Sequence, residues 1–274
     1  MKRKIITVSV TLLIIFLTFL QSSGAIGVST LGIWVTIPAG KTLTGSLTFT
    51  NFHSEEAKLV IKFCDWKRSE NGENILLEPN SSERSLIPYI KLTPKEAVLK
   101  PKESKKFKYE ITMPKEVNGS LWGALLAVPY GQERIMVKSD VRGEEELPLN
   151  ELARYGFSIK LWALEASSAV PAGEIKDLNV IKKEDVSNQF KLAFKNTGNV
   201  PLRPEGSLSI FDSTQKKIAS FKLDKFVVLP ESERILKIPG PDQELPEGDL
   251  RAEAVLKFGE GKVVKRQVAF REKE

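Results

Sequence analysis

Hydrophobic and polar residues alternate in two stretches of the chain that resemble each other. In Ser46–Asp65 the alternation runs up to Asn51, stops in a polar segment and then resumes. In Lys191–Asp212 it runs up to Asn196, stops in a segment with glycine and proline, and resumes. A two-residue period on both sides of such a break predicts two half-buried strands joined by a corner.

The resemblance continues downstream of both stretches. Leu99–Ser104 matches Leu229–Ser232, and Pro114–Ala124 matches Pro246–Ala252. One β unit therefore occurs twice in the sequence, and the first copy has extra residues between the matching positions. A repeat of this length predicts two tandem domains rather than a solenoid of short repeats.

The fold class follows from the same pattern. Of the 274 residues 41% are hydrophobic, enough for two cores, and they occur mostly in short alternating runs separated by many of the 15 prolines and 18 glycines. No long segment after the N-terminus has helical spacing. We predict an all-β protein of two tandem immunoglobulin-like β-sandwich domains. Seven strands are expected in the second domain, near residues 175–182, 189–195, 207–212, 219–223, 234–238, 250–258 and 263–270.

The N-terminus has the pattern of an export signal. Lys2–Lys4 is basic, Ile5–Leu20 is apolar, and small residues follow at Ser23 and Ala25. This predicts a signal peptide helix over residues 1–25, cleaved after Ala25, with an uncleaved membrane anchor as the alternative. Either way the body of the protein is expected to be extracytoplasmic: periplasmic, secreted or at the cell surface.

The remaining boundaries follow from the repeat. The first domain is expected over residues 26–165, a linker over 166–173 and the second domain over 174–274. The first domain contains an insertion, Tyr130–Tyr155, where the second copy has only the turn at Gly259–Gly261. The insertion is either a recognition loop or a flexible charged hairpin, and Ile135 and Val137 could form a short strand in it.

Two strands of the first domain are apolar on both faces. In Phe157–Leu164 the residues Phe157, Ile159 and Leu161 share one face, and Lys160 and Trp162 share the other. Such a strand is not expected to be a free edge.

The second such strand is Leu121–Val128, which we expect in the centre of a sheet. Trp122 on this strand either packs in the interior or lines a groove.

Charge and reactive residues exclude several classes of function. The formal charge is +6, from 41 basic and 35 acidic residues that are interspersed, which does not predict a nucleic-acid site. Cys64 is the only cysteine and His53 the only histidine, so no intrachain disulfide, metal cluster or Ser/His/Asp set is expected. The sequence also lacks a nucleophile elbow and a phosphate loop. We predict a protein that is not an enzyme and holds no cofactor or metal.

The tandem layout resembles the periplasmic pilus-assembly chaperones and their broader relatives. The resemblance covers nearly all of Val28–Phe270 and rests on the order and spacing of short pieces. These pieces are Pro38-Ala39-Gly40 with Leu47–Asn51, Leu92-Thr93-Pro94, Leu99-Lys100-Pro101, Ile159–Trp162, Asn196–Asn199 and Leu245–Gly248.

The resemblance implies two immunoglobulin-like domains set at an angle and a first domain that adds a strand to a partner subunit. It also implies a basic pair that anchors the partner's C-terminal carboxylate in the interdomain cleft. Lys160 matches one member of the pair. The other lies on the family's first strand, where Ile33–Ile37 holds neither arginine nor lysine.

We therefore predict a non-catalytic, chaperone-like exported module that binds an extended strand or subunit of envelope or surface proteins by β-strand addition. The alternative is a structural or adhesive surface protein of immunoglobulin-like modules with no client. A free apolar strand edge would favour the first hypothesis. The predicted partner-binding residues are Lys160, Phe157, Ile159, Leu161, Trp162, Trp122, Ile135 and Val137.

Overall fold

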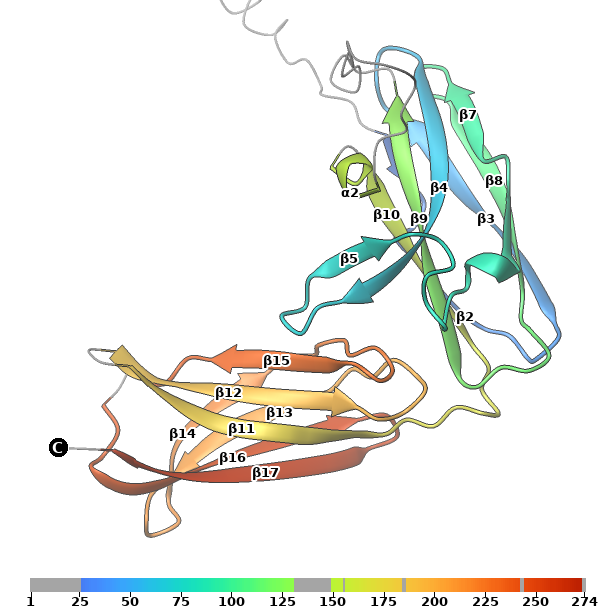
Figure 1. Cartoon of the computed structure of the whole chain (residues 1–274). Coiled ribbons are helices and arrows are strands. Elements are labelled where there is room, and N and C mark those ends of the chain that lie inside the picture. The colour runs from blue at the N-terminus through green and yellow to red at the C-terminus, as the bar shows by residue number, and fades with distance from the viewer. Residues whose placement is uncertain (1–25, 131–148, 155, 184–185, 242–243, 273–274) are drawn as a thin grey trace, which may run out of the picture.

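The computed structural model describes residues 26–130, 149–154, 156–183, 186–241 and 244–272 (Figure 1). The predicted signal segment and the residues Ile135 and Val137 lie outside these ranges. Among the described residues only two short helices occur, the 3-10 turn η2 (Ile87–Tyr89) and α2 (Leu149–Leu152). Within the same ranges, no helix has the length and apolar character needed to cross a membrane.

Ten strands form the first sandwich. One sheet has the order β1-β3-β8-β6 and the other has the order β2-β10-β9-β4-β5, with β7 beside β4. The strands are β1 (Ile26–Val28), β2 (Gly32–Thr36), β3 (Thr42–Asn51), β4 (Ala57–Arg68), β5 (Asn74–Leu77), β6 (Ile90–Thr93), β7 (Glu96–Leu99), β8 (Ser104–Thr112), β9 (Ser120–Tyr130) and β10 (Phe157–Leu164).

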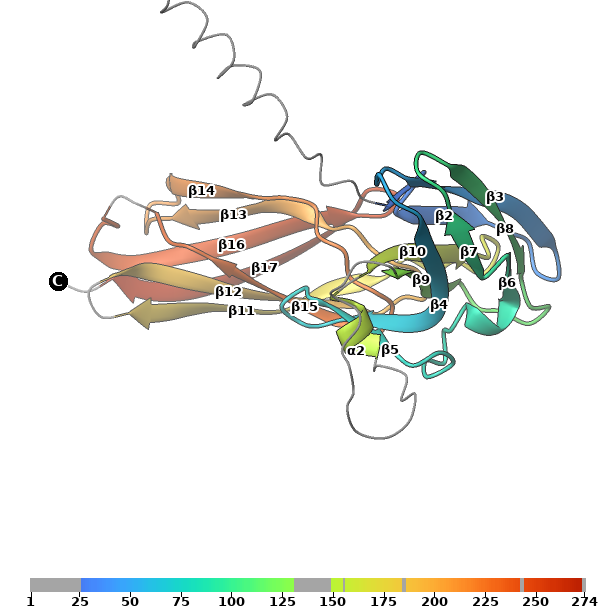
Figure 2. The ribbon, with the colours of Figure 1, turned by 90° about the horizontal axis from the view of Figure 1, so that it is seen from above.

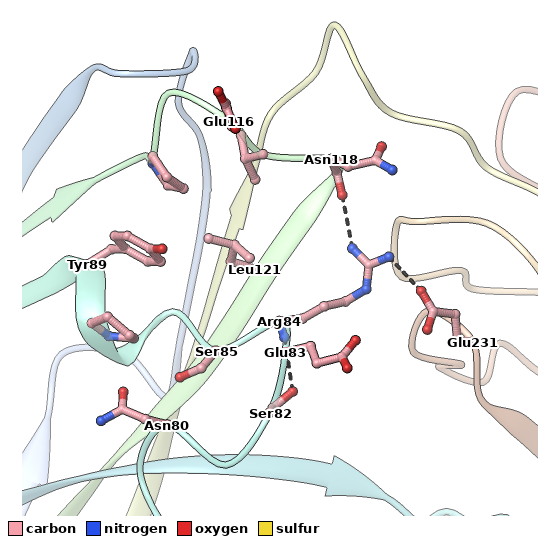
Figure 3. A pocket seen from close by; sticks show the side chains of 13 residues that line it. Asn80, Ser82, Glu83, Arg84, Ser85, Tyr89, Glu116, Asn118, Leu121 and Glu231 are labelled. Atoms are coloured by element: carbon pink, nitrogen blue, oxygen red, sulfur yellow. Dashed lines mark hydrogen bonds and ion pairs between the residues drawn. The ribbon is translucent and has the colours of Figure 1, made fainter.

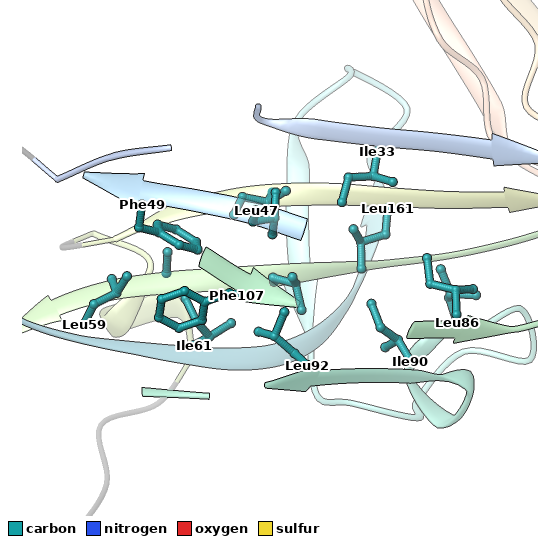
Figure 4. Packing of buried hydrophobic residues seen from close by; sticks show 14 of the residues in the cluster. Ile33, Leu47, Phe49, Leu59, Ile61, Leu86, Ile90, Leu92, Phe107 and Leu161 are labelled. Carbon is teal, nitrogen blue, oxygen red and sulfur yellow. The ribbon is translucent and has the colours of Figure 1, made fainter. Parts of the chain in front are cut away.

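The core of this sandwich is built from alternate residues of the facing strands (Figure 4). Leu47 and Phe49 of β3 lie opposite Leu59 and Ile61 of β4. The rings of Phe49 and Phe107 pack edge to face with centroids 4.8 Å apart. Burying each such side chain contributes about 1.5–3 kcal/mol, which is why the two-residue period fixes the face of each strand.

Seven strands form the second sandwich, in sheets of order β11-β12-β15 and β14-β13-β16-β17. Figure 2, seen from above, separates β11 and β12 from β13 and β14. The strands are β11 (Gly173–Lys183), β12 (Val186–Asn196), β13 (Glu205–Phe211), β14 (Lys217–Leu223), β15 (Glu233–Ile238), β16 (Gly248–Phe258) and β17 (Lys262–Glu272). The predicted all-β class, with two sandwiches in tandem, is confirmed.

The two corners seen in the sequence are the same structure. The side-chain amide of Asn51 donates to the carbonyl of Leu99 (3.0 Å), and that of Asn196 donates to the carbonyl of Val228 (3.0 Å). Each side-chain oxygen accepts a bond from the backbone amide two residues later. By these bonds Leu99 corresponds to Val228. The sequence pattern had instead matched Leu99 to Leu229, one position later. The structural correspondence aligns the prolines that follow, Pro101 and Pro230, rather than the leucines.

One element of the insertion was not predicted. The short helix α2 lies within the 130–155 segment, and its Leu152 is buried against the outer face of the β10-β9-β4 sheet beside Leu126 and Val128. A single helical turn gives too little periodicity to be read from a sequence.

The two sandwiches lie at an angle to each other, and the β4–β5 hairpin projects from the first toward β15 of the second (Figure 1). The chain passes between them from the end of β10 at Leu164 to the start of β11 at Gly173.

Candidate binding cleft

β10 is covered by neighbours along only part of its length. It pairs with β9 in antiparallel fashion from Phe157 to Leu164. On its other side β2 pairs with it in parallel fashion, and this ladder begins only at Lys160. Within the described ranges, no strand lies on the β2 side of Phe157–Ile159. The second half of β10 is therefore enclosed, as expected, whereas the first half has an edge that no described strand covers, which we call the free half-edge.

The side chains of β10 divide between two environments. Ile159 and Leu161 are fully buried in the core of the first sandwich, and their backbone groups point toward β9, because Lys160 and Leu164 are the residues that bond on the β2 side. Phe157 is half-buried against the same core. Lys160 and Trp162 point to the opposite, outer face of the sheet, which looks toward the second domain.

That outer face carries a cluster of tryptophans. The indole nitrogen of Trp122 donates to the carbonyl of Trp66 (3.0 Å), and Trp122 is only 6% exposed, so it packs in the interior rather than lining a groove. Trp66 meets Trp162 edge to face at 5.4 Å. Trp34 on β2 stacks on Trp162 at 3.7 Å and remains 48% exposed. Leu229 of the second domain packs against this cluster.

Two cations lie over the same indole ring. The ammonium nitrogen of Lys160 is 4.3 Å from the ring centroid of Trp66, and the guanidinium carbon of Arg68 is 5.9 Å from it. Burial lowers the pKa of Lys160 to about 8, and the charge of Arg68 adds to this shift. The guanidinium of Arg68 donates twice to the neutral side-chain oxygen of Asn74.

A buried hydrogen-bond donor beside these cations has no acceptor. The indole nitrogen of Trp162 is the one buried side-chain nitrogen or oxygen of the described residues that lacks a hydrogen-bond partner, and Trp162 is 7% exposed. An unsatisfied buried donor costs about 1–3 kcal/mol. The ammonium group of Lys160 and the guanidinium group of Arg68 are the groups here that can form charge-assisted hydrogen bonds with an anionic oxygen.

Two arginines of the second domain contact this region of the first domain. The guanidinium of Arg203 lies 4.3 Å over the ring of Trp34. Arg234 donates to the carbonyl of Glu70 in the β4–β5 hairpin (2.6 Å), and the amide of Ile235 donates to the same oxygen (2.8 Å). The region between the sandwiches that we call the cleft is the neighbourhood of Lys160, Trp162, the β4–β5 hairpin and Arg234.

A separate hollow of about 350 Å³ lies where the first domain meets the loop before β15 (Figure 3). Arg84 crosses its edge, forming an ion pair with Glu231 (2.7 Å) and donating to the carbonyl of Asn118 (2.9 Å). The Arg84 charge is therefore used to join the two domains. Tyr89 and Leu121 line the opposite side of the hollow.

The parts of the chain that the structure describes offer little support for metal binding or for a nucleophilic thiol. No group of three or more His, Cys, Asp or Glu side chains is placed to hold a metal ion there. The thiol of Cys64 is fully buried, and burial raises its pKa to about 12, so it is a poor nucleophile.

Sequence reasoning singled out Lys160 and Trp162 and missed their neighbours. Trp34, Arg68, Arg203 and Arg234 belong to four other segments of the chain, and nothing in their local pattern points to β10. One signal was available for Arg68. It shares a strand face with Cys64 and Trp66 by the two-residue period, so an apolar strand face that ends in arginine was visible in the sequence.

Comparisons with known proteins give similarity at the level of fold. No family model matches the chain, and no curated protein matches it. Among solved structures, a chain of the chaperone–tip adhesin complex of CFA/I fimbriae is 12% identical, with 89% of this chain and 98% of that chain covered and a TM-score of 0.45.

Two further solved structures match over a similar span. A chain of the CsuC–CsuE chaperone–tip subunit complex of Acinetobacter baumannii is 16% identical (88% and 97% covered, TM-score 0.42). The class 5 fimbriae chaperone CfaA is 12% identical (90% and 99% covered, TM-score 0.42).

Proposed function

We propose that this chain is a non-catalytic extracytoplasmic protein that binds an extended segment of another protein in a chaperone-like manner. The partner adds a strand beside the free half-edge of β10, at Phe157–Ile159. Main-chain hydrogen bonds supply the affinity in this mode of recognition, which suits an edge whose alternate side chains are buried in the core. The extracytoplasmic location rests on the export pattern of residues 1–25.

The observation that carries the proposal is the place where the free half-edge ends. It ends at Lys160, whose ammonium group forms no ion pair with any described residue, and beside Trp162, whose buried indole donor is unpaired. A strand added along Phe157–Ile159 brings its chain end to Lys160. We assign its terminal carboxylate to Lys160, with Arg68 of β4 as the second cation that the first strand lacks.

Lys160→Ala tests the assignment. An alternating valine–threonine peptide with a free carboxyl terminus is expected to bind the wild-type protein and to bind Lys160→Ala at least about tenfold more weakly, because a hydrogen bond to a charged group contributes about 1.5–3 kcal/mol. Calorimetry measures the affinity, and backbone NMR shifts at residues 157–160 locate the peptide.

The matched control is Lys222→Ala, an exposed lysine of β14 whose ion pair with Asp224 lies on the second domain. It should leave the affinity unchanged. Equal binding by both variants, in the peptide assay and in affinity purification from the envelope fraction, would remove Lys160 from the site.

A structural spacer without a client is the second candidate. Two strand edges that a client could use are already paired, which favours this candidate. β2 pairs with the second half of β10, and on the edge strand β15 the amide of Ile235 donates to the carbonyl of Glu70. Failure of any extended peptide to perturb residues 157–160 would support the spacer.

A further inference from the structure

Three positive charges in the cleft come from both domains. Arg68 lies at the base of the β4–β5 hairpin and Lys160 on β10, and both lie within 6 Å of the ring centroid of Trp66. Arg234 of β15 donates to the carbonyl of Glu70, two residues beyond Arg68 in the same hairpin. The hairpin therefore brings a charge of the second domain close to the two charges of the first.

Only neutral groups contact these three cations within the described ranges. Arg68 is held by the amide oxygen of Asn74, Arg234 by the carbonyls of Glu70 and Ile235, and Lys160 by the face of an indole. Burial lowers the pKa of all three groups, and the charge of Arg68 lowers those of Lys160 and Arg234 further.

Some cations elsewhere on the molecule have acidic partners. Lys176 pairs with Glu233 at 2.7 Å, and Lys58 pairs with Glu96 at 3.1 Å. Glu233 is the acidic residue next to Arg234, and its carboxylate is used by Lys176. No acidic side chain forms an ion pair with Arg68, Lys160 or Arg234 among the described residues.

We propose that the segment bound in this cleft is acidic, with at least one carboxylate in addition to its terminal one, and that it bridges Arg68 and Lys160 of the first domain to Arg234 of the second. This inference rests on the proposed function for the location of the segment. A single carboxylate can form close charge-assisted bonds with one or two of these groups and leaves the rest of the excess charge uncompensated.

A polypeptide accounts for the site better than a free inorganic anion does. Lys160 directly follows the edge at Phe157–Ile159, which can pair only with another extended chain. One polypeptide can use both features at once, because its strand pairs with the edge and its acidic end reaches the cations.

Three synthetic peptides test this inference. All share an alternating valine–threonine body; the first ends in Asp-Glu with a free carboxyl group, the second in Asn-Gln with a free carboxyl group, and the third in Asn-Gln amide. We expect the first to bind the full chain at least about tenfold more tightly than the second, with a steeper loss of affinity as salt is added.

Two variants and a control assign the effect to the arginines. Arg68→Gln and Arg234→Gln should reduce the preference for the acidic peptide, whereas Lys222→Gln should retain it. Because Arg234→Gln also removes a contact between the domains, the salt dependence of the wild-type protein gives an independent measure.

The outcomes separate the two proposals. Equal binding and equal salt dependence of the first two peptides would overturn the acidic preference and leave strand addition standing. Binding by none of the three would remove the proposed function, and the inference with it.

Discussion

At the scale of single residues, Lys160 has a pKa that differs from its usual value. Its pKa of about 8 lies below the usual 10.5 because the ammonium group is partly buried and Arg68 is near. Without a ligand, the unfolded chain binds more protons than the folded protein between these two values. The free energy of unfolding therefore rises with pH across this window. Below pH 8 the buried ammonium group is charged, and the full destabilisation that it causes is present.

The affinity for a carboxylate should have the opposite pH dependence. A carboxylate binds the protonated form of Lys160, so the affinity of the free-carboxyl peptide is expected to be constant below pH 8 and to fall as the pH rises from 8 toward 10. Calorimetry at pH 7, 8, 9 and 10 measures it. In Lys160→Arg the fall should disappear, because arginine stays charged; an unchanged fall in that variant would mean that another group titrates.

The sequence predicted individual residues where a local pattern repeats. Asn51 and Asn196 were visible because each ends an alternating run in its own domain, and each proves to hold a corner through its amide. Lys160 was found because it matches one member of the basic pair that the resemblance to the pilus-assembly chaperones implies. Arg68 and Arg234 were missed because only the folded hairpin brings them together.

At the scale of elements, the β4–β5 hairpin connects the domains. Its tip is a turn in which the amide of Gly72 donates to the carbonyl of Ser69 (2.8 Å), and Gly72 has a φ of 91°. The guanidinium of Arg234 lies directly over Gly72, in the space that a Cβ atom would need. Only glycine meets both requirements at this position.

Gly72→Ala should therefore loosen the interface. The left-handed backbone costs about 1–2 kcal/mol for alanine, and the new methyl group also displaces Arg234. We expect a wider distribution of interdomain orientations by small-angle X-ray scattering. Gly261→Ala is the matched control, because Gly261 has a φ of 85° and no atom lies within 4 Å of the position that its methyl group would take. If both variants scatter like the wild type, the hairpin does not hold the domains.

Strand positions were the most predictable elements. The limits of β10 agree with the predicted Phe157–Leu164, because its apolar residues occupy both faces and end abruptly. β4 runs on to Arg68, past the end of the alternating stretch at Asp65, because its last four residues pair with β5. That pairing depends on a short strand whose own sequence, Asn74–Leu77, shows little alternation.

At the scale of the whole molecule, the linker is fixed by hydrogen bonds between the sandwiches. The side chain of Asn199 accepts from the amide of Val170 (2.6 Å), and its amide group donates to the carbonyl of Ser168 (2.7 Å) and to the side-chain oxygen of Asn118. The hydroxyl of Ser168 accepts from the amide of Gly119 (2.9 Å). One buried asparagine thus joins the second domain, the linker and the first domain.

Glu165 holds the linker turn in a way that depends on pH. Hydrogen bonds from Ser168 and Ser167 lower its pKa to about 2 from the usual 4.5. Because the folded pKa is the lower one, the stabilisation is present above pH 4.5 and is lost as the pH falls toward 2.

We expect the interdomain orientation to broaden below pH 4.5. Glu165→Gln should show part of that broadening already at pH 7, because it lacks the charged acceptor. Small-angle X-ray scattering at pH 7 and pH 3 measures both effects, with circular dichroism as the check that the sheets persist. Asp212→Asn is the control: turn hydrogen bonds also lower the pKa of Asp212, far from the linker. Matching profiles for the two variants would contradict a role for Glu165.

The angle between the domains could not be predicted from the sequence. It depends on contacts such as Arg84 with Glu231 and Arg234 with Glu70, whose members are far apart in the chain and carry no shared pattern. The sequence repeat predicts two sandwiches but not the angle between them. The repeated residues form contacts within each sandwich, whereas the angle depends on contacts between the sandwiches, which are not repeated.

The placement of the tryptophans has a spectroscopic consequence. All four of the chain, at positions 34, 66, 122 and 162, lie on one sheet face of the first sandwich, and the second has none. Intrinsic indole emission thus reports on this face, and it registers the second sandwich only through the contacts of Arg203 and Leu229 with the tryptophans. The stacked rings of Trp34 and Trp162 form an exciton pair, so an occupant that separates them changes the near-ultraviolet dichroism without an added dye.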